Sequence, residues 1–277
     1  MHHRTLGLAA GVAVMSLALS ACVAGGQAGP AADSGDGITI GIKYDQPGLG
    51  QQVGSSYEGF DVDVATYVAK ELGYAEDQIT FMEAPSAQRE TLIQSGQVAL
   101  VFATYSITDE RKQKVSFAGP YFIAGQDILV RSEENTITGP QDLEGHTLCS
   151  VVGSTSAQKI KDQYPGVQLQ EVDTYSKCAE AVAAGSMDAL TTDDIILAGY
   201  AAQDQYKGKL KVVGNPFSEE RYGVGLKKDD TELQTKVNDA LKKMIDDGSW
   251  QKALDDNVGA SGYVPNPDLN PPTPGTA

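Results

Sequence analysis

Hydrophobic positions along the chain follow two alternating spacings, one typical of strands and one typical of helices. Residues 38–42 alternate isoleucine with smaller residues and are rich in β-branched side chains, which predicts a strand. Between Phe60 and Leu72 the apolar residues recur every three or four positions, which predicts a helix that Gly73 ends. A strand, a helix and a continuous apolar run typical of a strand buried on both faces follow at 79–82, 86–95 and 98–102. This order predicts an α/β unit with helices covering a mostly parallel sheet.

The same alternation begins again near residue 127 and predicts a second α/β unit. Strands are expected at 127–131, 147–152, 167–172, 187–191 and 210–213, with helices at 154–164, 176–184 and 194–202. After them come a strand at 222–226, a long amphipathic helix at 231–247 and a short helix at 250–257. Residues 264–277 hold five prolines, which predicts a disordered tail.

The N-terminus has the pattern of a targeting segment. A basic head is followed by an apolar run over residues 6–19, too short for a comfortable transmembrane helix, which predicts a signal peptide over 1–21. The run ends in Leu-Ser-Ala-Cys, which resembles the bacterial lipoprotein box and makes Cys22 the expected site of lipidation. An ordinary signal peptide with a chance cysteine is the alternative. Small and polar residues over 22–37 predict a flexible tether. We therefore expect a protein exported to the outer face of the cytoplasmic membrane.

Composition excludes several kinds of function. The 277 residues carry a formal net charge of −16, so nucleic acid is not an expected partner. Only His146 lies outside the targeting segment, which argues against a histidine-rich metal site or a Ser-His-Asp triad with a spare histidine. We expect no metal and no cofactor. In an exported chain the remaining cysteines, Cys149 and Cys178, are expected to form a disulfide, with two buried free thiols as the alternative.

Hydroxyl groups and one arginine follow the predicted strand at 98–102. Ligands of open α/β sheets bind beyond the carboxyl ends of strands, where Thr104, Ser106 and Arg111 are expected. A guanidinium can hold a carboxylate with two hydrogen bonds while hydroxyl and backbone N–H groups satisfy its other lone pairs. This pattern indicates a carboxylate site, although a polar surface loop with an Arg-Glu pair would have the same spacing.

Two further polar groups lie between a predicted strand and a predicted helix. Ser154 and Thr155 begin the helix predicted at 154–164, where backbone N–H groups can bind an anion. Asp193 follows the strand at 187–191, where its carboxylate could accept a ligand ammonium group. Plain helix capping explains either position as well.

Five motifs, taken in order, resemble the amino-acid-binding proteins of ABC importers, solute-binding family 3. They are Gly59–Ala65, Ser106–Arg111, Phe117–Phe122, Asp142–Gly145 with Val152–Thr155, and Tyr222–Val224. The resemblance extends over about residues 38–260. It implies a two-lobed, periplasmic-binding-protein-like α/β fold, with lobe 1 at 38–125 plus 222–263 and lobe 2 at 126–221. Two crossing segments would join the lobes, which close around a ligand.

The resemblance also implies a role for each candidate site residue. Arg111, Ser106, Thr104, Thr155 and Ser154 match positions that hold the α-carboxylate of an amino acid. Asp193 matches the acid that accepts the α-ammonium group, with Asp194 as the alternative if the match shifts by one position.

Specificity is expected to come from two further cations. Lys43 and Arg89 match positions where binders of acidic amino acids meet the side-chain carboxylate, and an unpaired buried cation would be costly. Either could instead point to solvent. Tyr44 and Tyr57 could stack near the ligand or pack in the core. The segment Lys43–Gly48 and the cysteine pair also resemble the glutamate-binding lipoproteins of actinobacteria.

These implications predict a monomeric, lipid-anchored receptor that binds L-glutamate or L-aspartate for an ABC permease and catalyses no reaction. A receptor for glutamine or another polar amino acid is one alternative. Another is an enzyme similar to the cyclohexadienyl dehydratases that share this fold, for which Glu83 or Glu90 could be the general acid. A sensor or adhesin lobe that signals through another chain is a third.

Overall fold

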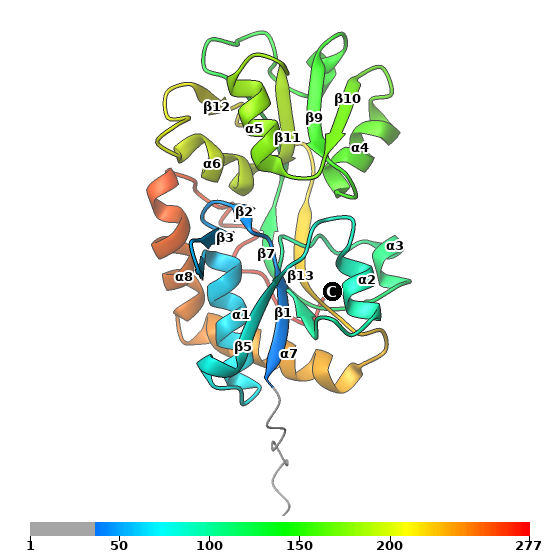
Figure 1. The fold of residues 1–277 in the computed structure, drawn as a ribbon, viewed down its shortest axis with the longest axis vertical. Helices are drawn as coiled ribbons and strands as arrows, with labels where there is room; N and C mark the ends of the chain where they lie inside the picture. The colour runs from blue at the N-terminus through cyan, green and yellow to red at the C-terminus, as the bar shows by residue number, and fades with distance from the viewer. Residues whose placement is uncertain (1–36) are drawn as a thin grey trace, which may run out of the picture. The chain divides into compact units, whose positions relative to one another are not determined.

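The computed structural model describes residues 37–277 (Figure 1). The expected signal peptide, the lipidated Cys22 and all but the last residue of the expected tether lie outside the described residues. Within 37–277 no helix combines the length and apolar character needed to cross a bilayer. The same part of the chain contains no group of three or more His, Cys, Asp or Glu side chains that could hold a metal ion.

The described chain forms two lobes, each built around a five-stranded sheet (Figure 1). In lobe 1 the strand order is β5-β1-β6-β13-β7, and β1 runs parallel to β5 and β6 while β13 runs antiparallel to β6 and β7. These strands span Ile38–Ile42 (β1), Ile79–Glu83 (β5), Leu100–Val101 (β6), Ser116–Ala124 (β7) and Glu220–Leu226 (β13). The sheet is therefore mixed, because β13 opposes the other four strands, three of which the sequence predicted to be parallel.

Lobe 1 also contains five α-helices and two short 3-10 helices. The apolar faces of α1, α7 and α8 belong to the same core as the sheet, and the ring of Phe60 packs edge-on against Trp250 with the centroids 5.7 Å apart. The helices of lobe 1 span Phe60–Glu71 (α1), Arg89–Gln94 (α2), Asp109–Lys112 (α3), Thr231–Asp246 (α7), Ser249–Val258 (α8), Glu76–Gln78 (η1) and Gly259–Ser261 (η3).

Lobe 2 has the strand order β10-β9-β11-β8-β12, with β8 antiparallel to β11 and β12. Its strands span Gln126–Arg131 (β8), Thr147–Val151 (β9), Gln168–Val172 (β10), Ala189–Asp193 (β11) and Leu210–Val212 (β12). Its helices span Pro140–Leu143 (η2), Thr155–Gln163 (α4), Tyr175–Ala183 (α5) and Asp194–Ala202 (α6). The predicted two-lobed α/β architecture is confirmed.

The chain crosses between the lobes twice. The first crossing lies between Ala124, the last residue of β7, and Gln126, the first residue of β8. The second precedes Glu220, which pairs with Ala124 at the start of β13. The two crossings therefore lie side by side.

A small antiparallel sheet, β2-β3-β4, was not predicted from the sequence. Its strands span Asp45–Gln46 (β2), Gly50–Val53 (β3) and Ser56–Glu58 (β4), too short to show a clear period of two. Figure 1 shows β2 between lobe 1 and the helices α5 and α6 of lobe 2, both of which it contacts.

The C-terminal segment differs from the predicted disordered tail. Asn270 pairs with both backbone groups of Ile123, accepting from its N–H at 2.9 Å and donating to its carbonyl at 2.8 Å. Near the end of the chain, the N–H groups of Gly275 and Thr276 donate to the carbonyl oxygen of Gly119. Proline-rich composition removes donors but not acceptors, so such a segment can still be held against the edge of a sheet.

Candidate functional site

A narrow cavity lies between the lobes, at the carboxyl ends of several strands. Charged groups on its wall are limited, among the described residues, to Arg89, Arg111 and Asp193. The other lining residues carry hydroxyl groups or are apolar: Ser86, Thr104, Ser106, Ser154, Thr155, Ser156, Tyr175, Thr192 and Ile196. The structure thus brings together the three polar groups that the sequence predicted separately.

Thr104 is held at the cavity in a strained backbone conformation. Its φ of 47° is unusual for a residue with a branched side chain. The buried carboxylate of Asp61 accepts the Thr104 N–H at 2.9 Å and the hydroxyl of Tyr121 at 2.7 Å. Burial raises the pKa of Asp61 to about 6, despite these two hydrogen bonds. Asp61 therefore fixes the loop that carries Thr104 and Ser106.

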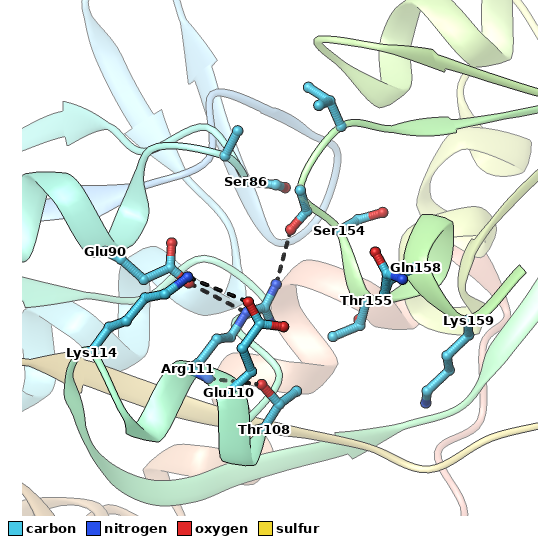
Figure 2. A pocket seen from close by; sticks show the side chains of 13 residues that line it. Ser86, Glu90, Thr108, Glu110, Arg111, Lys114, Ser154, Thr155, Gln158 and Lys159 are labelled. Carbon is cyan, nitrogen blue, oxygen red and sulfur yellow. Dashed lines mark hydrogen bonds and ion pairs between the residues drawn. The ribbon is translucent and has the colours of Figure 1, made fainter. Parts of the chain in front are cut away.

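Arg111 connects the two lobes at one side of the cavity. Its Nη1 donates to the carbonyl oxygen of Ser106 at 2.7 Å, and its Nη2 donates to that of Gly153 in lobe 2 at 3.1 Å. Its Nε lies 3.5 Å from Oε1 of Glu90 (Figure 2). The guanidinium carbon lies 4.9 Å from the centroid of the Tyr105 ring. These contacts orient the guanidinium at the position expected for a carboxylate-binding arginine.

Arg89 is buried without a carboxylate partner among the described residues. It is 3% exposed and donates from Nη2 to the Ser86 hydroxyl at 2.7 Å, while Nε has no partner. Its guanidinium carbon lies 4.9 Å from the centroid of Tyr105, the same ring that Arg111 contacts. Burial, and then the charge of Arg111, lower the pKa of Arg89 from its ordinary value. A second cation of this kind creates a strong site for an anion.

Asp193 presents one free carboxylate oxygen in the cavity. It ends β11 and is 3% exposed; its Oδ2 accepts the Tyr222 hydroxyl at 2.6 Å and its Oδ1 has no partner. Burial, and then the charge of Glu220, raise the pKa of Asp193 to about 8. Asp194 instead accepts from Gly125, Ile195 and Tyr263 outside the cavity. Of the two acids, Asp193 is therefore the one that can meet a ligand.

Ser154 and Thr155 lie at the N-terminus of α4. Ser154 caps this helix by accepting the N–H of Ala157 at 3.0 Å. Thr155 donates its hydroxyl to Oε2 of Glu220 at 3.1 Å and lies 3.3 Å from the Ser106 hydroxyl of lobe 1. This segment therefore both caps α4 and lines the cavity.

Three candidate residues do not line the cavity. Lys43 is buried, but its Nζ lies 3.4 Å from Oδ1 of Asp45, so it has a carboxylate partner in the chain itself. Burial lowers its pKa more than Asp45 raises it. Tyr44 and Tyr57 pack on each other with ring centroids 5.1 Å apart, and their hydroxyl oxygens lie 3.2 Å apart.

A wider groove adjoins the cavity and shares Ser86, Arg111, Ser154 and Thr155 with it. Figure 2 shows the groove with charged side chains from both lobes along it. Arg111 stands where the groove and the cavity meet. The groove therefore borders the cavity along these shared residues.

The sequence reasoning missed several residues that line the cavity or contact its charged groups. Tyr105 and Tyr222 do not line the cavity, but Tyr105 contacts Arg89 and Tyr222 donates to Asp193. Both belong to or adjoin motifs that were recognised, but their positions in those motifs gave no sign of these contacts. Periodicity does not distinguish Tyr175, at the start of α5, or Thr192, near the end of β11. Whether such a residue faces the other lobe depends on how the two lobes meet, which the sequence does not show.

The predicted disulfide is present. Cys149 of β9 and Cys178 of α5 are joined, with their Cα atoms 5.5 Å apart. The bond fixes α5 against the sheet of lobe 2, and α5 carries the cavity-lining Tyr175.

Comparisons with known proteins agree with this geometry. The family described as bacterial extracellular solute-binding proteins, family 3, matches residues 38–260. Glutamate-binding protein GluB of Corynebacterium glutamicum is 48% identical over 265 residues, covering 91% of this chain and 89% of that protein. The ABC transporter glutamine-binding protein GlnH of Bacillus subtilis is 36% identical, covering 78% of this chain and 79% of that protein.

Among solved structures, the GluR0 ligand-binding core from Nostoc punctiforme, in complex with L-glutamate, superimposes with a TM-score of 0.69. It is 28% identical, and the match covers 79% of this chain and 98% of that one.

Proposed function

The chain belongs to family 3 of the bacterial extracellular solute-binding proteins, and on that basis we propose that it binds L-glutamate between its lobes. In this proposal it is a receptor that delivers glutamate to an ABC permease. Closure of the lobes around the ligand removes it from water.

The balance of charge in the cavity carries this proposal. Arg89 and Arg111 contribute two positive charges, and Asp193 contributes a negative charge once an ammonium group beside it favours the ionised carboxylate. Glutamate at neutral pH has two carboxylates and one ammonium group. One carboxylate can therefore pair with Arg89, which has no carboxylate partner in the described chain, and the other with Arg111, which Glu90 also contacts. Glutamine would leave one guanidinium without an anion, and an unpaired buried charge is costly.

Each charged group has a proposed role. Arg111 binds the α-carboxylate, together with the cavity-facing groups of Thr104, Ser106, Ser154 and Thr155. Asp193 accepts the α-ammonium group through Oδ1, which has no partner in the chain. Arg89 binds the side-chain carboxylate. Because Lys43 pairs with Asp45, we assign the side-chain carboxylate to Arg89 alone.

The glutamate-binding relative from Corynebacterium supports this ligand, whereas the glutamine-binding relative from Bacillus makes glutamine the competitor to test. A receptor is also favoured over an enzyme by the positions of the two candidate acids. Glu83 is exposed, and Glu90 is engaged by Arg111 and by the Tyr105 hydroxyl at 2.8 Å. Neither lines the cavity.

Calorimetric titration of the ligand-stripped chain with L-glutamate, L-aspartate and L-glutamine tests the proposal. We expect glutamate to bind with a Kd of about 1 µM or tighter, which corresponds to about −8 kcal/mol or better. Aspartate is expected to bind more weakly, because its side-chain carboxylate lies one methylene closer to the backbone.

Arg89→Met is the matched variant for specificity. It keeps much of the side-chain volume and removes the charge, so glutamate affinity should fall by about 100-fold or more while glutamine affinity changes little. Lys242→Met removes an exposed charge on α7, far from the cavity, and serves as the control. A preference for glutamine in the unmodified chain, or equal losses for both ligands in Arg89→Met, would contradict the assignment of Arg89.

We further propose that lipidated Cys22 anchors the receptor to the outer face of the cytoplasmic membrane. The lipoprotein-box sequence supports this step. Cys22→Ser should move the protein from the membrane fraction to the medium, and recovery of an unlipidated wild-type protein would contradict it.

A further inference from the structure

Asp45 of lobe 1 forms a set of hydrogen bonds with lobe 2. Its Oδ2 accepts the N–H of Ser176 at 3.2 Å and lies 3.4 Å from the Ser176 hydroxyl. The hydroxyl of Tyr200 lies within hydrogen-bond distance of both the carbonyl oxygen and Oδ2 of Asp45. One residue thus contacts two helices of the opposite lobe, α5 through Ser176 and α6 through Tyr200.

Helix α5 lacks a cap of its own at the point that Asp45 reaches. The side chain of its N-cap residue, Thr174, accepts no backbone N–H of the first turn; it accepts only the Ser176 hydroxyl, at 3.0 Å. A carboxylate at a helix N-terminus satisfies free N–H groups and interacts favourably with the helix dipole. Asp45 supplies this carboxylate from the other lobe, so the Ser176 N–H has its side-chain acceptor only when the lobes are together.

Lys43 holds the Asp45 carboxylate in place. Its Nζ lies 3.4 Å from Oδ1, and its side chain is 2% exposed against 14% for Asp45. Nζ also lies 5.9 Å from the centroid of the Tyr175 ring at the start of α5. Hydrogen bonds to an ionised and partly buried carboxylate are stronger than those between neutral groups.

Asp45, Ser176 and Tyr200 do not line the cavity. In Figure 1 they belong to β2, α5 and α6, on one side of the lobe boundary, whereas Arg111 and Gly153 connect the lobes next to α3 and α4 on the other side. Their contacts therefore depend on closure and not on which ligand is enclosed.

We propose that Asp45 is a positioning residue that fastens the closed lobes by capping α5 and holding Tyr200, and so sets ligand affinity without selecting the ligand. This inference rests on the proposed function, because affinity for an amino acid is its main readout. It gives Lys43 a role through Asp45 in place of a ligand contact.

The test compares Asp45→Ala, Asp45→Asn and Tyr200→Phe with the wild-type chain, using glutamate and glutamine as ligands. We expect Asp45→Ala to weaken both ligands by the same factor, about 10-fold or more, through faster dissociation. Asp45→Asn keeps one accepting oxygen, so its affinity for both ligands should fall by a smaller factor. Asp63→Asn is the control, since that carboxylate accepts from Asn257 within lobe 1.

A double-mutant cycle distinguishes the loss of the contacts between Asp45 and Tyr200 from a general loss of structure. Asp45→Ala combined with Tyr200→Phe should weaken binding by less than the product of the two single effects. Either change removes the contact between Tyr200 and Oδ2 of Asp45, whereas the contact to the Asp45 carbonyl is lost only in Tyr200→Phe. Unchanged affinity, additive losses, or a change in the glutamate-to-glutamine ratio of more than about threefold would overturn the proposal.

Hydrogen exchange at the Ser176 amide gives a readout that needs no ligand. Asp45→Ala should expose this amide to faster exchange, while Asp63→Asn should not. If the wild-type chain binds none of the three amino acids, the proposed function fails and this exchange rate alone decides the inference. Equal exchange in the wild-type and Asp45→Ala chains would overturn it.

Discussion

The hydroxyl of Tyr222 donates a 2.6 Å hydrogen bond to Oδ2 of Asp193, and this bond joins β13 of lobe 1 to the end of β11 in lobe 2. It fixes the carboxylate so that Oδ1 remains for a ligand. Burial and Glu220 raise the pKa of this carboxyl to about 8, while the Tyr222 bond and Lys159 act in the opposite direction and Asp194 adds a smaller increase.

Closure of the empty cleft should therefore take up a proton at Asp193. When the lobes separate, water reaches this carboxyl and its pKa returns toward the ordinary range, about 3.9. The closed, empty form binds the proton more tightly, so lowering the pH from 8 to 6 should increase its population. X-ray scattering of the ligand-free chain should then give a smaller radius of gyration at pH 6 than at pH 8.

Asp193→Asn is the matched variant for this pH effect. It removes the titrating group but keeps the shape and one accepting oxygen, so its radius of gyration should not change between pH 6 and pH 8. A wild-type radius that is constant, or that grows at low pH, would contradict the role of Asp193.

Gly199→Ala should change stability and affinity in opposite directions. Gly199 lies within α6, where alanine is favoured over glycine by about 1 kcal/mol, so the ligand-free chain should become more stable. A Cβ atom there would overlap the carbonyl oxygen of Pro47 in lobe 1, so closure should be hindered and all ligands should bind more weakly. Urea denaturation and calorimetry measure the two effects, and unchanged affinity would show that the lobes close differently.

Removal of the disulfide should destabilise the protein without changing what it binds. Cys149 and Cys178 are separated by 29 positions, and a crosslink that closes a loop of this length stabilises by about 3–4 kcal/mol. Cys149→Ala with Cys178→Ala should lower the free energy of unfolding by about that amount, as measured in urea. Glutamate affinity should stay within about threefold of wild type, since neither residue lines the cavity. Reduction of the disulfide in the wild-type protein should lower the free energy of unfolding by the same amount.

Asn270→Ala should lower stability through the edge of β7. The side-chain amide serves both backbone groups of Ile123, and its removal leaves a half-buried N–H and carbonyl without a partner. The expected loss is about 1–3 kcal/mol in the free energy of unfolding. Asn266→Ala, in the same segment, is a useful comparison because its side chain accepts only from Asp268 nearby. Equal stability of the two variants would mean that the segment does not contribute to the fold.

Spacing along the sequence was sufficient to predict that the candidate residues lie at or beyond strand ends. Asp193 ends β11, Thr155 begins α4, which follows β9, and Arg111 lies in the short helix α3, which follows β6. The cavity between the lobes brings the three together. The same reasoning was insufficient for Lys43, which also lies after a strand. Its partner Asp45 belongs to a short sheet whose strands are too brief to show periodicity, so the pairing could not be read from the chain.

Contacts between segments distant in the chain were also beyond the sequence reasoning. The proline-rich end of the chain was expected to be disordered from composition alone, but Asn270 finds its partner at Ile123. Likewise, nothing local distinguishes Glu220, whose interactions with Thr155 and Lys159 depend on the second crossing lying beside α4.

The strand order of lobe 1 has a consequence for the order in which the chain folds. Strand β13 lies between β6 and β7, and Val101 pairs with Gly225, so the lobe 1 sheet needs a strand that follows all of lobe 2 in sequence. Lobe 2 is one continuous stretch, and the residues of its disulfide and of its five strands all precede β13 in the chain. In a chain that emerges from its N-terminus, lobe 2 can therefore complete its core first, while the edges of β6 and β7 that β13 joins stay unpaired. Distant pairing of this kind folds slowly and exposes strand edges in the meantime.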